Sequence, residues 1–300
     1  MFQQCISFLF FMQKNGLFIG LTTIDIQFFT DKYPEPNKKV KTEPPEILVG
    51  GPATNAAAAF AHLNGGANLV SAVGKNPFKS FIQNDFNKTK IEFTDLTASR
   101  ETHPVLAAVI TSKQNGDRNI FTHFPATVQP EISAEKLFER TVYDIVLLDG
   151  FYPEFSLECA RLARKNKIPV VMDCGSWKPQ YADLLNFADV VIASADFFPP
   201  ECVETGDVFD FIRKKGVRFS AISRGSRSIL FQTKKGRGEV PVKKVKVADT
   251  LGAGDFFHGA FCYYFLQTKL NFESALKKAA ELSTFTCQFE GTRSWLNFTE

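Results

Sequence analysis

The stretch Val247 to Phe261, VADTLGAGDFFHGAF, decides how this chain is read. The run from Val240 to Val247 alternates β-branched residues with lysines and predicts an edge strand that Asp249 and Thr250 close. The small residues Gly252, Ala253 and Gly254 follow, and Asp255 opens an apolar run that predicts a helix. Backbone N–H groups at such a glycine-rich helix start have no intrahelical partner and lie at the positive end of the helix dipole. The stretch therefore predicts an anion-binding loop.

Asp255 is unusual at this position, because a carboxylate is repelled by any anion bound beside it. A helix cap is the simplest explanation for an aspartate at a helix start. The alternative is a general base, which would accept a hydroxyl proton while the loop amides stabilise the oxygens of a transferred phosphoryl group. The residues alone leave both interpretations open.

Two motifs resemble the signatures of one enzyme family. DTLGAGD (residues 249–255) resembles the C-terminal signature of the ribokinase-like (pfkB) carbohydrate kinases, and it is not a P-loop, which requires G-x-x-x-x-G-K-[ST]. GGPATNAA (residues 50–57) resembles the N-terminal signature of the same family. The resemblance implies a ribokinase-like α/β fold, with a doubly wound, mostly parallel sheet flanked by helices and a small β-sheet lid. It also implies ATP and Mg²⁺ as cofactors.

Length and composition agree with a single enzyme domain over residues 1–300, since 44% of the residues are hydrophobic. A net charge of +3 from well-mixed charges predicts no nucleic-acid partner. The six cysteines show no metal-binding spacing and are typical of reduced thiols in a cytoplasmic protein. Residues 1–11 are apolar but too short to span a bilayer and lack the features of a signal peptide. We expect an extension without an assigned role there, and no membrane association.

Hydrophobic patterning predicts alternating strands and helices. The continuous apolar run from Gly16 to Ile26 predicts the central buried strand. Segments 27–49 and 91–124 are expected to form the lid, which includes a β-hairpin made of Val105 to Thr111 and Arg118 to Phe124. Three further strand and helix units predict a doubly wound sheet. Residues from about 190 to 300 are expected to bind the nucleotide.

Candidate sugar-binding residues lie mainly in the first half of the chain. Ligands of open α/β sheets bind beyond the carboxyl ends of the strands, and Asp25 lies at the end of the first predicted strand. By resemblance, the residues that face the sugar are Asp25, Asn37, Gly50, Gly51, Asn55 and Asp149. The two glycines allow close backbone approach, and the Asn55 amide can donate to and accept from hydroxyls. Asn37 is equally well explained as a turn residue, and Asp149 as a structural carboxylate.

The segments GLTTIDIQFFTDKYP (residues 20–34) and GDRNI (residues 116–120) resemble most closely the ketohexokinase branch. In that branch a basic residue that matches Arg118 reaches the nucleotide phosphates from the lid, and an arginine left in solvent at the hairpin end is the alternative explanation. Lids of this type often pair across a dimer, so a homodimer through the lid is a further expectation. Gly225, Asp249 and Thr250 are the other expected nucleotide contacts. No side chain is predicted to be a dedicated metal ligand.

The expected activity is ATP-dependent phosphorylation of a primary hydroxyl on a ketose-like sugar. In this interpretation Asp255 deprotonates the hydroxyl, and the amides of Gly252, Ala253 and Gly254 stabilise the transferred phosphoryl group. Two alternatives stay open. One is a nucleoside kinase of the same fold, in which Phe28 and Phe29 would form an aromatic clamp for the base. The other is a sugar or nucleotide sensor without catalytic activity.

Overall fold

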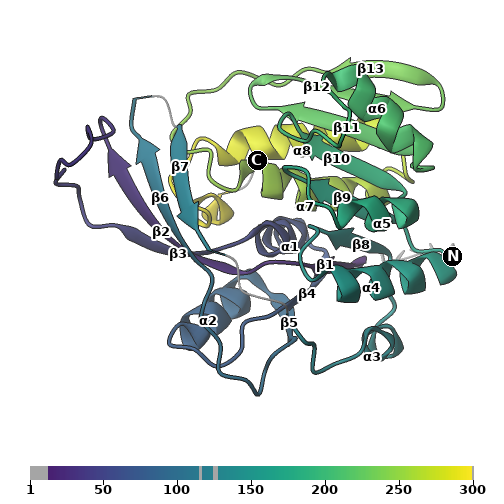
Figure 1. Cartoon of the computed structure of the whole chain (residues 1–300), viewed down its shortest axis with the longest axis horizontal. Coiled ribbons are helices and arrows are strands. Elements are labelled where there is room, and N and C mark those ends of the chain that lie inside the picture. The colour runs from purple at the N-terminus through teal and green to yellow at the C-terminus, as the bar shows by residue number, and fades with distance from the viewer. Residues whose placement is uncertain (1–12, 115–116, 124–127, 299–300) are drawn as a thin grey trace, which may run out of the picture.

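The computed structural model describes residues 13–114, 117–123 and 128–298. These residues form a large sheet of nine strands and a small sheet of four (Figure 1). The order across the large sheet is β13 (Gly236–Val240), β12 (Arg227–Thr233), β11 (Phe219–Arg224), β10 (Val190–Ser194), β9 (Val170–Cys174), β8 (Ile145–Leu148), β1 (Asn15–Ile19), β4 (Gly66–Ser71) and β5 (Ile91–Asp95). In this spatial order all strands from β11 across to β5 run parallel, and β12 and β13 add an antiparallel edge.

Helices cover both faces of the large sheet, which confirms the expected doubly wound architecture. One apolar cluster joins the sheet to α1 (Pro52–His62), α2 (Lys79–Thr89), α7 (Ala253–Gln267) and α8 (Phe272–Thr286). A second cluster on the opposite face holds α3 (Ala134–Arg140), α4 (Pro153–Lys165), α5 (Tyr181–Leu184) and α6 (Thr205–Lys214). Alternation along β1 produces this division, because Phe18 packs in the first cluster while Leu17 and Ile19 pack in the second. None of the described helices is long and apolar enough to cross a membrane.

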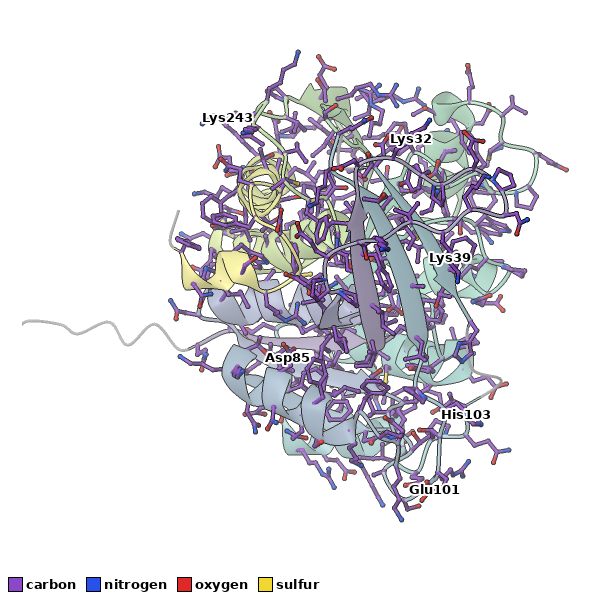
Figure 2. All side chains as sticks on the ribbon, turned by 90° about the vertical axis from the view of Figure 1, so that its left-hand side faces the viewer. Lys32, Lys39, Asp85, Glu101, His103 and Lys243 are labelled. Carbon is purple, nitrogen blue, oxygen red and sulfur yellow. The ribbon has the colours of Figure 1, made fainter. Side chains whose placement is uncertain are left out.

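The small sheet, which we call the lid sheet, extends to the left of the large sheet in Figure 1. Its order is β3 (Glu46–Gly50), β2 (Thr23–Thr30), β6 (Leu106–Ser112) and β7 (Arg118–Thr122). β2 and β6 are parallel, and the outer pairs are antiparallel. Buried side chains on one face of the lid sheet, Ala107 and Val109, pack against Leu251 of the glycine-rich loop. Figure 2 views the molecule from the side of the lid sheet and labels Lys32 and Lys39 in the loop that joins β2 to β3.

The prediction of a single strand from Gly16 to Ile26 was wrong. The run is divided into β1, which lies inside the large sheet, and β2, which lies in the lid sheet. The chain turns at Gly20, where an added Cβ would lie only 2.0 Å from the Asp149 carboxylate. Hydrophobicity could not reveal this division, because the residues on both sides of the turn are equally buried.

Two further boundaries differ from expectation. β13 ends at Val240 and residues 241–248 form no strand, because Pro241 has no N–H for a sheet ladder. Residues 91–95 form β5, which pairs with β4 in the large sheet, so they are not part of the lid. The predicted hairpin is present as β6 and β7. Residues 1–11 and the hairpin residues Asn115 and Gly116 lie outside the described residues.

The order of the strands places the candidate site. Strands added after β1 continue in one direction through β4 and β5, whereas β8 to β11 lie on the other side of β1. Ligands of open α/β sheets bind where the strand order reverses in this way, beyond the carboxyl ends of the strands. Helices α1 and α7 approach closely above this point, since a Cβ on Gly259 would lie 2.0 Å from the Ala56 carbonyl oxygen. This contact brings the two sequence signatures together.

Candidate active site

The glycine-rich loop ends in a helix start with free backbone donors. Gly252 is the N-cap of α7 and has a φ of 75°, a conformation that favours glycine. The next residue, Ala253, donates from its backbone to Thr250 O at 3.2 Å, whereas Gly254 N and Asp255 N have no backbone acceptor among the described residues. A Cβ on Gly254 would have open space around it. The loop can therefore hold an anion at the N-terminus of α7, as its sequence predicted.

Asp249 and Thr250 tie this loop to its surroundings. Asp249 is buried, and its carboxylate accepts from Leu251 N at 2.9 Å, Gly291 N at 3.0 Å and Gln27 Nε2 at 2.8 Å. Thr250 Oγ1 accepts a hydrogen bond from Arg118 Nη1 at 2.5 Å. The structure thus brings the predicted lid arginine to the anion loop. Asp249 fixes the shape of that loop by binding β2 and the C-terminal segment.

The Asp255 carboxylate lies at the centre of the candidate site. Asn55, on α1, donates from Nδ2 to Asp255 Oδ2 at 2.9 Å. Burial and then the negative charge of Asp173 raise the pKa of Asp255 to about 7, while the Asn55 hydrogen bond, His258 and Arg118 act in the opposite direction. A pKa near neutrality suits a group that must accept a proton at physiological pH.

His258 lies one helical turn after Asp255 and is buried. Its Nδ1 is 2.7 Å from Gly254 O, and its Nε2 is 3.5 Å from the Asp173 carboxylate at the end of β9. The structure adds a link between the first turn of α7 and β9, beside the candidate base.

The predicted sugar residues Asp25, Gly50, Gly51 and Asn55 lie together at the edge of the lid sheet. Asp25 is buried on β2 and accepts from Thr23 Oγ1 at 2.7 Å. Burial raises the pKa of Asp25, and the Thr23 hydrogen bond and the Arg293 charge partly offset this effect. A Cβ on Gly50 would lie 2.1 Å from Asp25 Oδ2, and Gly51 has a φ of 102° at the start of α1. Gly50 is therefore required beside Asp25, whereas Gly51 is required by its positive φ and by the Leu21 carbonyl oxygen, which an added Cβ would approach to 2.2 Å.

Asp149 is placed at the junction of three segments and is nearly inaccessible to solvent. Its carboxylate accepts from the backbone N–H groups of Leu21 at 2.8 Å, Ala53 at 3.3 Å and Phe151 at 3.0 Å. Burial raises its pKa to about 6, against the charge of Lys178 and these hydrogen bonds. The geometry describes a structural carboxylate that anchors the ends of β1 and β8 and the start of α1.

Two of the predicted site residues are not brought to this cluster. Asn37 has a φ of 61° and is exposed in the loop between β2 and β3, which fits the alternative explanation as a turn residue. Gly225 has a φ of 62° and is exposed in the turn between β11 and β12, where its conformation favours glycine. No hydrogen bond links either residue to the other candidates among the described residues.

Sequence reasoning missed Arg293 and Asp85. Arg293 lies immediately before the short 3₁₀ helix η2 (Ser294–Asn297) in the C-terminal segment and donates from Nη1 to Asn55 Oδ1 at 2.9 Å. Asp85, on α2, accepts from Arg293 Nε at 3.0 Å and from Nη2 at 3.1 Å. An isolated arginine after the last long helix and an aspartate on an amphipathic helix carry no sequence signal for this contact. Their roles depend on tertiary packing alone.

The described residues contain no group of three His, Cys, Asp or Glu side chains that could hold a metal ion. The Mg²⁺ expected from the sequence commonly keeps several waters in proteins and binds through substrate phosphates.

Comparisons with known proteins agree with this geometry. The model of the pfkB family carbohydrate kinases matches residues 13–297. A ribokinase from Lactococcus lactis is 26% identical over 284 residues, which cover 92% of this chain and 91% of the relative. A nucleoside kinase from Methanocaldococcus jannaschii is 26% identical over 250 residues, 81% of this chain and 80% of the relative.

A solved structure shows the same fold. The crystal structure of a fructokinase with bound ATP from Xylella fastidiosa superimposes with a TM-score of 0.77 at 20% identity, covering 95% of each chain. The family match extends over both signatures, the lid sheet and the C-terminal segment that carries Arg293. This chain belongs to the pfkB family of carbohydrate kinases, which are phosphotransferases.

Proposed function

We propose that this protein transfers the γ-phosphoryl group of ATP to a primary hydroxyl of a sugar, with Asp255 as the general base. The observation that carries the proposal is the 2.9 Å hydrogen bond between Asn55 and Asp255. It joins the half of the site that holds the candidate sugar residues to the half that holds the anion loop. A carboxylate at this junction can contact an acceptor hydroxyl and a phosphoryl group at the same time.

In the proposed mechanism the chain's own residues perform three tasks. Asp25 and Asn55 orient the sugar through its hydroxyls, and Asp255 accepts the proton of the attacking hydroxyl. The free amides at the start of α7 stabilise the charge that develops on the transferred phosphoryl oxygens. Mg²⁺, when bound with ATP, supplies further neutralisation of the phosphate charge. Arg118 lies beside the loop and would contact the phosphates from the lid.

The proposed acceptor is a ketose such as fructose. The resemblance of residues 20–34 and 116–120 to the ketohexokinase branch supports this choice. A nucleoside acceptor is the second candidate, because a nucleoside kinase is among the relatives. Phe29 also favours it, since strand alternation places its side chain on the same face of β2 as Asp25, whereas Phe28 is on the opposite face.

The outer face of the lid sheet supports pairing with a second copy of the chain, as part of the same proposal. Ile26, Ile47, Ala108 and Phe121 are in register across the four strands, and so share one face. Phe121 is 70% exposed and Ile47 is 47% exposed. Sedimentation analysis of the wild type and of Phe121→Asp should show a dimer that the substitution dissociates. A monomeric wild type at assay concentration would remove this part of the proposal.

The central test is an ADP-release assay with ATP, Mg²⁺ and a panel of ketoses, aldoses and nucleosides. We expect turnover with at least one sugar and the highest kcat/KM with a ketose. Turnover with nucleosides alone would establish the second candidate. No acceptor-dependent ADP release, together with measurable sugar or ATP binding by calorimetry, would favour the sensor.

A further inference from the structure

Four side chains from four separate segments form a continuous chain of polar contacts that ends at the candidate base. Asp85 lies on α2, Arg293 in the C-terminal segment, Asn55 on α1 and Asp255 at the start of α7. Figure 2 labels Asp85, the outer end of this chain. Only the Asn55 and Asp255 end touches the predicted sugar site. The contacts of Arg293 with Asp85 and with Asn55 therefore need an explanation that binding of the sugar does not give.

Arg293 is held in a fixed orientation. Its Nε and Nη2 donate to the Asp85 carboxylate at 3.0–3.2 Å, and Nη1 donates both to Thr292 O at 3.0 Å and to Asn55 Oδ1 at 2.9 Å. The guanidinium group is planar, so these partners together define the position of Nη1. The side chains of Arg293 and Asp85 are 16% and 15% exposed, which limits the screening of their interaction by water.

The segment that carries Arg293 is itself anchored. Thr292 is buried and donates from Oγ1 to Val49 O at 3.2 Å, and Gly291 N donates to Asp249 at 3.0 Å. Trp295, which is fully buried, packs edge-on against Phe256 of α7 with ring centroids 5.0 Å apart. The arginine is therefore positioned relative to the lid strand β3, the anion loop and helix α7.

The chemistry of the contacts sets the orientation of the Asn55 amide. A guanidinium group has donors only, so the atom of Asn55 that faces Arg293 must be the carbonyl oxygen. The NH₂ group then faces Asp255 and donates to Oδ2, whereas the flipped amide would present its oxygen to the carboxylate and its NH₂ to the guanidinium. Both contacts of the flipped amide would be repulsive. Arg293 thereby selects the amide orientation that holds the carboxylate.

We propose that Arg293, anchored by Asp85, is a positioning residue for phosphoryl transfer that acts on Asp255 through Asn55. This inference rests on the assignment of Asp255 as the base. Asn55 occupies Oδ2 of the carboxylate, and Oδ1 has no hydrogen-bond partner among the described residues. Arg293 thus determines which oxygen of Asp255 is available to take the hydroxyl proton. The carboxylate of Asp85 pairs with the positive charge, so that the arginine orients the amide while its own charge is largely balanced.

The test compares Arg293→Lys with Arg213→Lys, which makes the same change in the exposed pair formed with Asp210 on α6. Lysine keeps the charge at position 293 but has no planar fork to hold Asp85 and Asn55 together. We expect kcat to fall roughly tenfold to a hundredfold, because small displacements of reacting groups reduce the rate by such factors. The KM for ATP should be unchanged. Asp85→Asn should lower kcat in the same direction, and Asp85→Glu should restore most of it. Arg213→Lys should have no effect.

A second measurement does not depend on turnover. The Asp255 carboxyl carbon is followed by NMR through a pH titration without substrates, and its resonance is identified by its loss in Asp255→Asn. The groups that face this carboxylate are Asp173 from β9, His258 from α7 and Arg118 from β7, together with Asn55. The substitution at position 293 replaces none of these four residues. Loss of the oriented Asn55 donor should raise the pKa of Asp255 by about one pH unit.

The outcomes separate the two assignments. An upward titration in Arg293→Lys with reduced kcat supports the positioning role. A titration that does not move overturns it, even if kcat falls, because the arginine would then act only on folding or elsewhere in the site. If Arg293→Lys does not fold, the same titration on Asp85→Asn decides the question. A wild type that releases no ADP with any acceptor would refute the proposed function, while the NMR titration would still decide whether Arg293 orients the carboxylate.

Discussion

Replacement of Asp255 by asparagine should remove activity and stabilise the protein at the same time. Asparagine keeps the size of the side chain and an oxygen that can cap α7, but it cannot accept the hydroxyl proton. We expect turnover to fall by about 10²–10⁴-fold, the usual contribution of a general base. A residue with only a capping role would leave turnover nearly unchanged in this variant.

The predicted gain in stability follows from the pKa of Asp255, which rises from 3.8 to about 7 on folding. Between these two values the folded state binds more protons than the unfolded state, so the free energy of unfolding decreases as the pH rises. The full difference of about three pH units corresponds to about 4 kcal/mol. Because Asp255 is partly exposed, water reduces this cost, and we expect Asp255→Asn to be more stable by about 1–2 kcal/mol at pH 8.

Urea unfolding of the wild type and the variant at pH 8 and below pH 4 measures this gain, and ADP release measures turnover. The gain should vanish at low pH, where the carboxyl is protonated in both the folded and the unfolded state. Asp207, in the capping box of α6, is the matched control, because its backbone hydrogen bonds lower its pKa. Asp207→Asn should destabilise the protein above pH 4 and leave turnover intact. An active Asp255→Asn, or one less stable than the wild type at pH 8, would refute the reasoning.

Three further substitutions test the remaining parts of the site. Arg118→Ala should raise the KM for ATP about tenfold or more through loss of charge-assisted hydrogen bonds, with sugar affinity by calorimetry unchanged; an unaltered KM for ATP would contradict the phosphate contact. Asp25→Ala should weaken sugar binding by about 1–3 kcal/mol without affecting ATP, and undiminished sugar affinity would place the sugar elsewhere. Asp149→Ala should lower the free energy of unfolding in urea by about 1–3 kcal/mol, since three backbone amides lose their acceptor; equal stability would count against its anchoring role.

The sequence predicted the glycine-rich loop and the start of α7 because the signals for both are local. Gly252 needs a positive φ and Asp255 follows it at a helix start, and both properties depend on a few consecutive residues. The apolar strands of the parallel sheet were equally clear, since β8 is buried at all four positions. These features predict the doubly wound fold without knowledge of distant contacts.

The remaining features depend on contacts between distant segments. β1 ends before Gly20, which lies against the carboxylate of Asp149, 129 positions later in the chain. Arg293 contacts Asn55 across 238 positions, and no local pattern marks either partner for the other. The turn conformation of Asn37 fits its local sequence. Its position away from the site, however, follows from the path of the β2–β3 loop, which no local pattern reveals.

The hydrogen bond between Gln27 and Asp249 gives the two substrates a means of influencing one another. β2 carries Asp25, which we propose to bind the sugar, and also Gln27, which holds the Asp249 carboxylate in the proposed nucleotide loop. A sugar that reduces the mobility of this strand also orders the loop, so less conformational entropy is lost when ATP binds. Thermodynamic reciprocity then requires ATP to tighten sugar binding by the same factor. The two substrates are therefore expected to bind with positive cooperativity, in either order of addition.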